Sequence, residues 1–197
     1  FGVATKITVR LLLQPEAVKT FLGIFPDVDS ACTAVSAVIG HGIVPAALEM
    51  IDALSIRAVQ NVMDAGYPDD AGAVLLIELE GLQEEVDEIG EEVEAALWES
   101  GPTQVRTAEK AEDRDILWVG RKGALGALGS LAPNYYLVDG VVPRTQLTQV
   151  LRRVAEISQE YGIPIANVFH AGDGNLHPCL LFDERQPGAL DKIVEAG

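Results

Sequence analysis

The chain of 197 residues is long enough to bury a substantial core, and its 48% hydrophobic content indicates an ordered globular protein. Its formal net charge of −16 argues against nucleic acid or an anionic membrane as a partner, because phosphate binding needs clustered basic side chains. Two cysteines, Cys32 and Cys179, are too few for a disulfide framework, and no apolar run is long enough to span a membrane. These features predict a cytoplasmic protein.

The first part of the chain alternates predicted strands and helices. Residues 5–13 are rich in β-branched side chains and predict a strand, and residues 18–25 predict a second one. Asp27 or Asp29 is a suitable cap for a helix that runs to His41. Further elements are expected at 45–51 (extended), 53–65 (helix) and 73–79 (a strand whose nearly continuous apolar run predicts burial on both faces).

The second part continues this alternation. The acidic stretch from Glu84 to Glu94 carries apolar residues at helical spacing, which indicates a solvated helix face rather than a cation site. Further along we expect a strand at 104–107, a helix at 109–129, a strand at 135–142, a helix at 147–161, strands at 165–170 and 176–182, and a helix at 188–196. The glycines of the 109–129 helix favour close helix packing or a broken, mobile helix over a dinucleotide-binding loop.

This order of elements predicts an α+β fold, with an antiparallel or mixed sheet and helices mainly on one side. A short echo, Gly42-Ile43-Val44-Pro45 and Gly162-Ile163-Pro164-Ile165, follows a helix in each half and suggests two similar halves. The chain begins at Phe1 without a methionine and ends at Gly197, just after a predicted helix. We therefore expect it to be a fragment of a longer polypeptide.

The stretch NVFHAGDGNLHP, residues 167–178, contains two of the three histidines, seven residues apart. Asp173-Gly174 favours a type I′ hairpin turn, which would place His170 opposite His177 with Cβ atoms about 4.5–5.5 Å apart. A turn centred one residue away is expected to put the rings on opposite faces. Paired imidazoles bind zinc, manganese or iron when a third group completes the site. The alternative is a structural turn, which leaves the facing pair unexplained.

Two other residues are candidates for ligand binding. Arg121 follows Trp118 in an otherwise acidic protein, and its guanidinium matches a carboxylate in two-point contact. The alternative is a surface ion pair with the acidic run 109–115, which residue chemistry alone slightly favours. Asp139 lies in a predicted strand that is otherwise apolar, where it would orient a ligand or the arginine; a half-buried, hydrogen-bonded carboxylate is the alternative.

The stretch NVFHAGDGNLHP closely resembles the C-terminal, substrate-side region of FAD-linked oxidases of the vanillyl-alcohol oxidase type. The resemblance covers essentially the whole chain through four further motifs: ALEMIDALSIR at 47–57, DAGYPDDAGAVLLIELEG at 64–81, WVGRKGA at 118–124 and PNYYLVDGVVPR at 133–144. It implies that residues 1–197 form one ferredoxin-like α+β cap domain. That cap would lie over the isoalloxazine ring of an FAD held by a separate N-terminal domain.

The resemblance also implies a site. It expects a divalent metal near the flavin, with His170 and His177 matching two histidine ligands, and Arg121 matching the arginine that holds the substrate carboxylate. Three more residues of the motif would shape the turn and support the ligands: Asp173, Gly174 and Asn175.

The chain also departs from the family pattern. The FAD domain is missing, and the third metal ligand and the base belong to a Gly-Glu-His-Gly-type motif that would lie beyond Gly197. We therefore expect no catalytic residue within 1–197, and an isolated chain that folds but has weak or no metal binding, no retained flavin and no oxidase activity. Relatives acting on 2-hydroxyglutarate carry a lysine in the strand after the arginine helix. Residues 134–137 offer none, which favours a substrate with one carboxylate, such as glycolate or D-lactate.

The expected function is that of a substrate- and metal-binding cap in a flavin-dependent 2-hydroxy-acid oxidoreductase. Its expected partners are other subunits of a glycolate-oxidase-type complex, through which the protein would associate peripherally with the inner membrane. One alternative is a non-catalytic binding or assembly domain with a metal-free structural hairpin. Another is a family member with different flavin chemistry, in which the two histidines contact the substrate directly.

Overall fold

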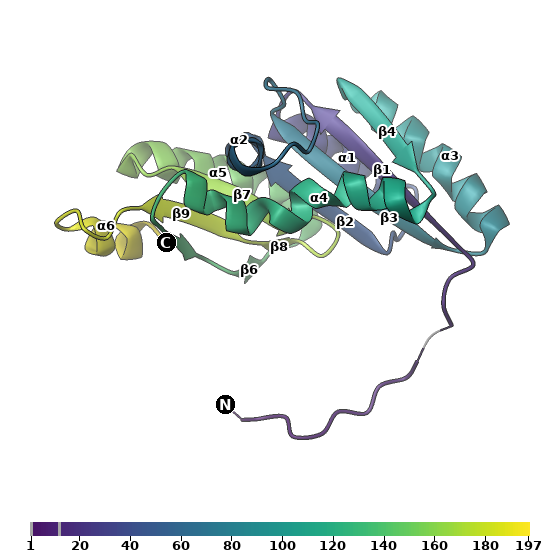
Figure 1. Ribbon diagram of the computed structural model, residues 1–197, viewed down its shortest axis with the longest axis horizontal. Coiled ribbons are helices and arrows are strands. Elements are labelled where there is room, and N and C mark those ends of the chain that lie inside the picture. Colours follow the sequence, from purple (N-terminus) through teal and green to yellow (C-terminus); the bar gives the residue numbers. More distant parts are fainter. Residues whose placement is uncertain (1, 12) are drawn as a thin grey trace.

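A computed structural model describes residues 2–11 and 13–197 (Figure 1). Its 9-stranded sheet has the order β4-β1-β3-β2-β7-β8-β6, with β9 joining β7 and β5 joining β9. All strand pairs in the described part are antiparallel, which confirms the predicted sheet type. The strands are β1 (Ala17–Phe25), β2 (Ala47–Asp52), β3 (Ala73–Gly81), β4 (Gln104–Ala108), β5 (Asn134–Leu137), β6 (Gly140–Val141), β7 (Ile165–His170), β8 (Asn175–Leu176) and β9 (Pro178–Phe182).

Helices cover both faces of this sheet. They are α1 (Val28–Gly40), α2 (Ala53–Val62), α3 (Gln83–Glu99), α4 (Ala111–Ala127), α5 (Leu147–Tyr161) and α6 (Ala189–Ala196), with short 3₁₀ turns at Leu128–Ser130 and Arg144–Gln146. Helices α1, α3 and α5 pack on one face, and α6 joins them through Ile193. Helices α2 and α4 pack on the other face, visible in front of the sheet in Figure 1. Four of the six described helices therefore lie on one face, as expected, and α2 and α4 add a smaller second layer on the other face.

Strand β3 shows why both layers exist. Its apolar run leaves no solvated face, since Leu75 and Ile77 point into the core beneath α1 and α3, whereas Val74 and Leu76 point into the core beneath α2 and α4. A strand that is apolar at every position needs cover on both sides. The predicted burial on both faces is confirmed.

The two halves of the chain are not alike. The first half has the strand order β4-β1-β3-β2, with α1 and α3 on one face, which is the ferredoxin-like arrangement. The second half instead has five short strands, in which β9 bridges β7 and β5. The sequence similarity between residues 42–45 and 162–165 is therefore confined to two loops, and the strand topology of the two halves differs.

The N-terminal segment forms no strand in its described part, residues 2–11. It extends away from the sheet (Figure 1) and leaves Val3, Ile7, Val9 and Leu11 between 68% and 89% exposed. The predicted strand at 5–13 is therefore not formed over 5–11, because these residues have no neighbouring strand with which to pair; residue 12 of that prediction lies outside the described residues. We call residues 2–11 the N-terminal arm.

The strand predicted at 135–142 is broken in two. Strand β5 pairs with β9, and β6 pairs with β8, so the chain changes partner between Leu137 and Gly140. Asp139 lies in this break and not in a strand, which corrects its predicted position. The break leaves the Asp139 carboxylate at the rim of the sheet next to His177.

Candidate functional site

The hairpin of the histidine motif has a different register from the predicted one. His170 pairs with Asn175, so residues 171–174 form the loop and the turn is centred one residue earlier than expected. Gly174 has a positive φ of +70°, but Asp173 does not, so the predicted type I′ turn at these two residues is absent. The turn instead begins with a hydrogen bond from the Asp173 backbone N–H to the His170 carbonyl oxygen.

The two histidines nevertheless share one face of the sheet. Moving the turn centre by one residue moves the paired position by two, and side chains two positions apart point the same way. His177 therefore lies diagonal to His170, and the prediction that such a shift would separate the rings is wrong. Their ring centroids are 5.2 Å apart with an interplanar angle of 87°. Diagonal neighbours on a sheet remain within reach of large side chains.

Each ring turns its Nδ1 atom toward a carboxylate. The Nδ1 atom of His170 lies 2.8 Å from Oε1 of Glu49, which is a hydrogen bond. The Nδ1 atom of His177 is buried and lies 3.4 Å from Oδ1 of Asp139, without the alignment of a hydrogen bond. The Nε2 atom, on the far edge of each ring, has no hydrogen-bond partner in the part of the chain that the structure describes.

Glu49 joins the histidine pair to Arg121. The second carboxylate oxygen of Glu49 accepts a hydrogen bond of 2.7 Å from Nη2 of Arg121, and the Glu49 and Arg121 side chains are only 12% and 14% exposed. This pairing replaces the surface ion pair considered for Arg121. The neighbouring Lys122 does make such a pair, with its Nζ atom 3.3 Å from Oδ1 of Asp115. The Arg121 Nε atom is buried and has no partner among the described residues.

Helix α4 packs closely against the C-terminal end of α2 and the loop after it, because two of its glycines face them. A Cβ atom on Gly120 would overlap the Tyr67 ring, and one on Gly123 would lie 2.5 Å from the Met63 terminal methyl group. Gly120 and Gly123 thus serve close packing, one of the two predicted uses. Arg121, next to Gly120, reaches Glu49 of β2 from this helix. Burial raises the pKa of Tyr67 to about 12, although the positive charges of Arg106 and Arg121 oppose the shift.

The supporting residues of the motif lie around this pair. Asn175 is directly opposite His170 on the same face, and its buried Oδ1 atom has no partner among the described residues. Gly174 approaches the Val142 carbonyl so closely that a Cβ atom would collide with it. The Gly172 N–H donates to the Leu48 carbonyl oxygen at 3.0 Å, which fixes the loop beside β2.

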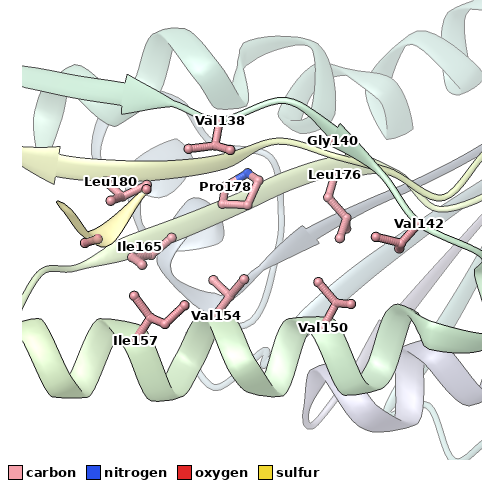
Figure 2. A pocket seen from close by; sticks show the side chains of 12 residues that line it. Val138, Gly140, Val142, Val150, Val154, Ile157, Ile165, Leu176, Pro178 and Leu180 are labelled. Atoms are coloured by element: carbon pink, nitrogen blue, oxygen red, sulfur yellow. The ribbon is translucent and has the colours of Figure 1, made fainter. Parts of the chain in front are cut away.

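Two hollows border the region from different sides. A hollow of about 150 Å³ beside His170 is also lined by Glu49 and Asp173. A second, apolar groove of about 210 Å³ lies under α5, where Val150, Val154 and Ile157 point toward the strands (Figure 2). The groove is on the opposite face of the sheet from Arg121 and offers no charged group to hold a carboxylate. The hollow beside His170 is the better candidate for a ligand site because Arg144 also lines it, whereas Arg121 and His177 lie outside its lining.

The histidine pair fits a metal only as an incomplete site. Ligating histidines in proteins usually donate the N–H of the other ring nitrogen to a carboxylate or carbonyl group, and His170 is arranged in this way. However, no cluster of three His, Cys, Asp or Glu side chains that could hold a metal ion is found among residues 2–11 and 13–197. Residues 1–197 thus offer two nitrogen donors and need at least one further ligand.

Comparison with known proteins identifies the family. The model of the C-terminal domain of FAD linked oxidases matches residues 14–196, nearly the whole chain. The chain belongs to this family. The predicted resemblance is therefore confirmed. Within the described residues, this FAD linked oxidase domain has no helix that is both long and apolar enough to cross a membrane.

Curated relatives share this FAD linked oxidase domain. Glycolate oxidase subunit GlcD of Escherichia coli (strain K12) is 46% identical over 100% of this chain and 39% of its own length. Subunit GlcD of Bacillus subtilis (strain 168) is 35% identical over 99% of this chain and 42% of its own. The mitochondrial D-lactate dehydrogenase [cytochrome] of Arabidopsis thaliana is 29% identical over 92% of this chain and 32% of its own length. The chain thus spans about two fifths of the length of the GlcD relatives it matches.

Solved structures support the fold. p-Cresol methylhydroxylase with bound substrate superimposes with a TM-score of 0.66 at 15% identity, over 92% of this chain and 42% of that one. 4-Ethylphenol oxidase from Gulosibacter chungangensis gives a TM-score of 0.65 at 13% identity, over 95% of this chain and 43% of that one. At such low identity the likeness concerns the fold alone.

Glu49 is the site residue that sequence reasoning missed. It lies in β2 between Leu48 and Met50, which are buried on the opposite face, and it shares its own face with buried Ile51. A carboxylate between buried apolar residues of a strand was the available signal, similar to the one that singled out Asp139. Asp139 does not contact Arg121, which corrects one of its two expected roles.

Proposed function

We propose that this domain is the substrate-binding cap of a flavin-dependent enzyme that oxidises a small 2-hydroxy acid, such as glycolate or D-lactate, to the 2-oxo acid. The observation that carries the proposal is the linked arrangement of Arg121, Glu49 and His170 beside His177 on one face of the sheet. The names of the glycolate oxidase and D-lactate dehydrogenase relatives point to the same substrate class.

In this proposal each residue of the chain has a separate task. Arg121 binds the substrate carboxylate, for which its guanidinium has the matching two-point geometry. His170 and His177 offer Nε2 to a divalent metal, which would polarise the substrate hydroxyl as a Lewis acid, and a further ligand and the base are assigned outside residues 1–197. FAD, when bound to the full-length protein, would supply the acceptor for the Cα hydride. The word subunit in the GlcD names supports assembly with other subunits. Attachment of a cytoplasmic protein to the inner membrane through such subunits is part of the proposal and has no support in those names.

The test uses the full-length, flavin-containing protein. Anaerobic addition of glycolate or D-lactate should bleach the oxidised flavin, and Arg121→Met should slow this roughly 100-fold, because two charge-assisted hydrogen bonds contribute about 3 kcal/mol. Lys122→Met is the matched control, since Lys122 is a neighbouring exposed cation, and it should retain most of the rate. Equal rates for the two variants would refute the role of Arg121. No bleaching by any 2-hydroxy acid in the wild-type protein would favour the alternative of a binding or assembly domain.

A further inference from the structure

We propose that Glu49 is a positioning residue, which fixes the nitrogen of His170 that carries the proton while it holds Arg121 in place. This inference rests on the proposed function for its purpose, but its geometry stands independently. One carboxylate oxygen of Glu49 faces Nδ1 of His170 at 2.8 Å and the other faces Nη2 of Arg121 at 2.7 Å.

Hydrogen-bond chemistry permits only one neutral form of His170 beside this carboxylate. An ionised carboxylate only accepts hydrogen bonds, so Nδ1 must be the donor, and in the neutral ring Nε2 is then left with its lone pair. That lone pair is what a metal or a substrate hydroxyl requires. The Glu49 side chain is 12% exposed, so water competes little for either oxygen.

Arg121 determines which atom of the side chain at position 49 faces it and which atom faces His170. A guanidinium has only donors, so whatever replaces Glu49 must keep an acceptor toward Arg121. In Glu49→Gln the amide oxygen would therefore face Arg121, and the amide NH₂ would face Nδ1 of His170. Nδ1 would then have to accept, and the neutral ring would carry its proton on Nε2. A change that preserves size and removes one negative charge should thus reverse the tautomer of a neighbouring residue.

His177 provides an internal comparison. Its Nδ1 atom is 3.4 Å from Asp139, whose side chain is 62% exposed, so solvent competes for that carboxylate. Among residues 2–11 and 13–197, Glu49 is the residue that ties a ring of the pair to Arg121. The fixed tautomer therefore belongs to His170, and Asp139→Asn should leave it unchanged.

The experiment is long-range ¹H–¹⁵N NMR on the histidine-labelled 197-residue chain at mildly alkaline pH, where the tautomers differ in ring-nitrogen shifts. Wild-type His170 should be the Nδ1–H form, Glu49→Gln should give the Nε2–H form, and Asp139→Asn should match the wild type. A wild-type ring protonated on Nε2 overturns the proposal, even if the Glu49→Gln chain fails to fold. An unchanged tautomer in folded Glu49→Gln overturns it as well.

Binding of Zn²⁺ alone to the full-length protein separates this inference from the proposed function. With the metal role intact, Glu49→Gln should weaken Zn²⁺ affinity by about 10- to 100-fold, the usual effect of removing a partner of a ligating histidine. Equal Zn²⁺ affinity in both proteins contradicts the positioning of a ligand. If the wild type binds no Zn²⁺ and the NMR result holds, the metal role fails and the positioning role of Glu49 stands.

Discussion

Two aspartates cap helices in the same way but in different surroundings. Asp27 accepts a hydrogen bond of 2.7 Å from the Ser30 N–H at the start of α1, on the surface. Asp52 accepts one of 2.9 Å from the Ser55 N–H at the start of α2, and also binds the backbone N–H and side-chain amide of Asn167, each at 2.8 Å. Asp52 therefore ties α2 to β7, the strand that ends in His170.

Replacing each cap should separate these roles. Asp27→Ala should cost about 1 kcal/mol in the free energy of unfolding, and Asp52→Ala about 3 kcal/mol or more, because it also leaves the half-buried N–H groups of Asn167 without an acceptor. Urea unfolding followed by circular dichroism measures both. Equal losses would show that the Asn167 bonds contribute nothing to stability.

The two caps also differ in their response to acid. The bond from Ser30 lowers the pKa of Asp27, so its contribution is fully present above the ordinary pKa of 3.8 and is lost as the pH falls through the lowered value. Burial raises the pKa of Asp52, although its hydrogen bonds oppose this. The Asp27→Ala defect should therefore shrink in acid, which unfolding at several pH values would reveal; a defect independent of pH would contradict this.

Both thiols are held in the protonated state by burial. Burial raises the pKa of Cys32 and of Cys179 from 9.0 to about 11. At about pH 8 neither should react with a thiol reagent until the chain unfolds, because the thiolate is the reactive form. Stability supplied by these thiols is present below pH 9 and falls as the pH rises toward 11. Rapid labelling of the folded protein would contradict this, and the double Cys→Ala variant should lose stability less steeply in alkali.

At the residue level, sequence reasoning could identify chemical types but not contacts. His170, His177 and Arg121 stood out as unusual residues in an acidic, apolar chain. Whether they bind a metal and a carboxylate remains a prediction. Glu49 was missed because its partners Arg121 and His170 are 72 and 121 residues away in the sequence. The pairing of β2 with β7 brings His170 to Glu49, and the packing of α4 on the sheet brings Arg121 to it.

At the element level, local signals placed most helices and strands, because caps, glycines and apolar periodicity act within a few residues. Helix α1 begins after Asp27 as expected, and α5 ends at Gly162 in the left-handed conformation. Hairpin register was harder. It depends on which strand the loop meets, and here the Gly172 bond to Leu48 of β2 helps to set the loop.

The glycines of α4 allow an element-scale test. A Cβ atom on Gly120 would lie 2.6 Å from the Tyr67 Cζ atom, so Gly120→Ala should cost about 1–3 kcal/mol through overpacking. Gly126, in the same helix, has open space around the added carbon, so Gly126→Ala should stabilise by up to about 1 kcal/mol. Thermal unfolding compares them.

The same pair probes the site. Gly120→Ala should also displace the neighbouring Arg121 and lower the rate of flavin reduction in the full-length protein, whereas Gly126→Ala should not. A destabilised Gly120→Ala protein with the wild-type rate would mean that close packing of α4 does not position the arginine.

At the scale of the whole molecule, composition and element order were sufficient for the class of fold but not for its layers. The apolar run of β3 showed that this strand is buried on both faces, yet it could not show which helices supply the cover. Which helices cover a face depends on the face of the sheet over which each connection between strands passes, and this is determined only when the whole sheet assembles. The second layer matters because α4 of this layer carries Arg121.

The N-terminal arm has a consequence for the behaviour of the protein in solution. Its exposed side chains Val3, Ile7, Val9 and Leu11 occupy odd positions, so an extended arm presents one apolar ribbon with unpaired backbone groups along both edges. Such a segment is a template for pairing with another copy of itself. The net charge of −16 opposes this association at low ionic strength, and salt screens the repulsion.

We therefore expect salt-induced self-association of the isolated chain that begins at the arm. Light scattering should rise with added salt in the wild type, and Ile7→Lys with Val9→Lys should suppress the rise. Thr8→Lys, on the other side of the extended arm, should suppress it far less. If all three proteins scatter alike, the association has another source. If the prediction holds, the negative charge of the domain keeps its molecules single at low salt. The salt concentration of the buffer then determines whether they assemble further through strand pairing.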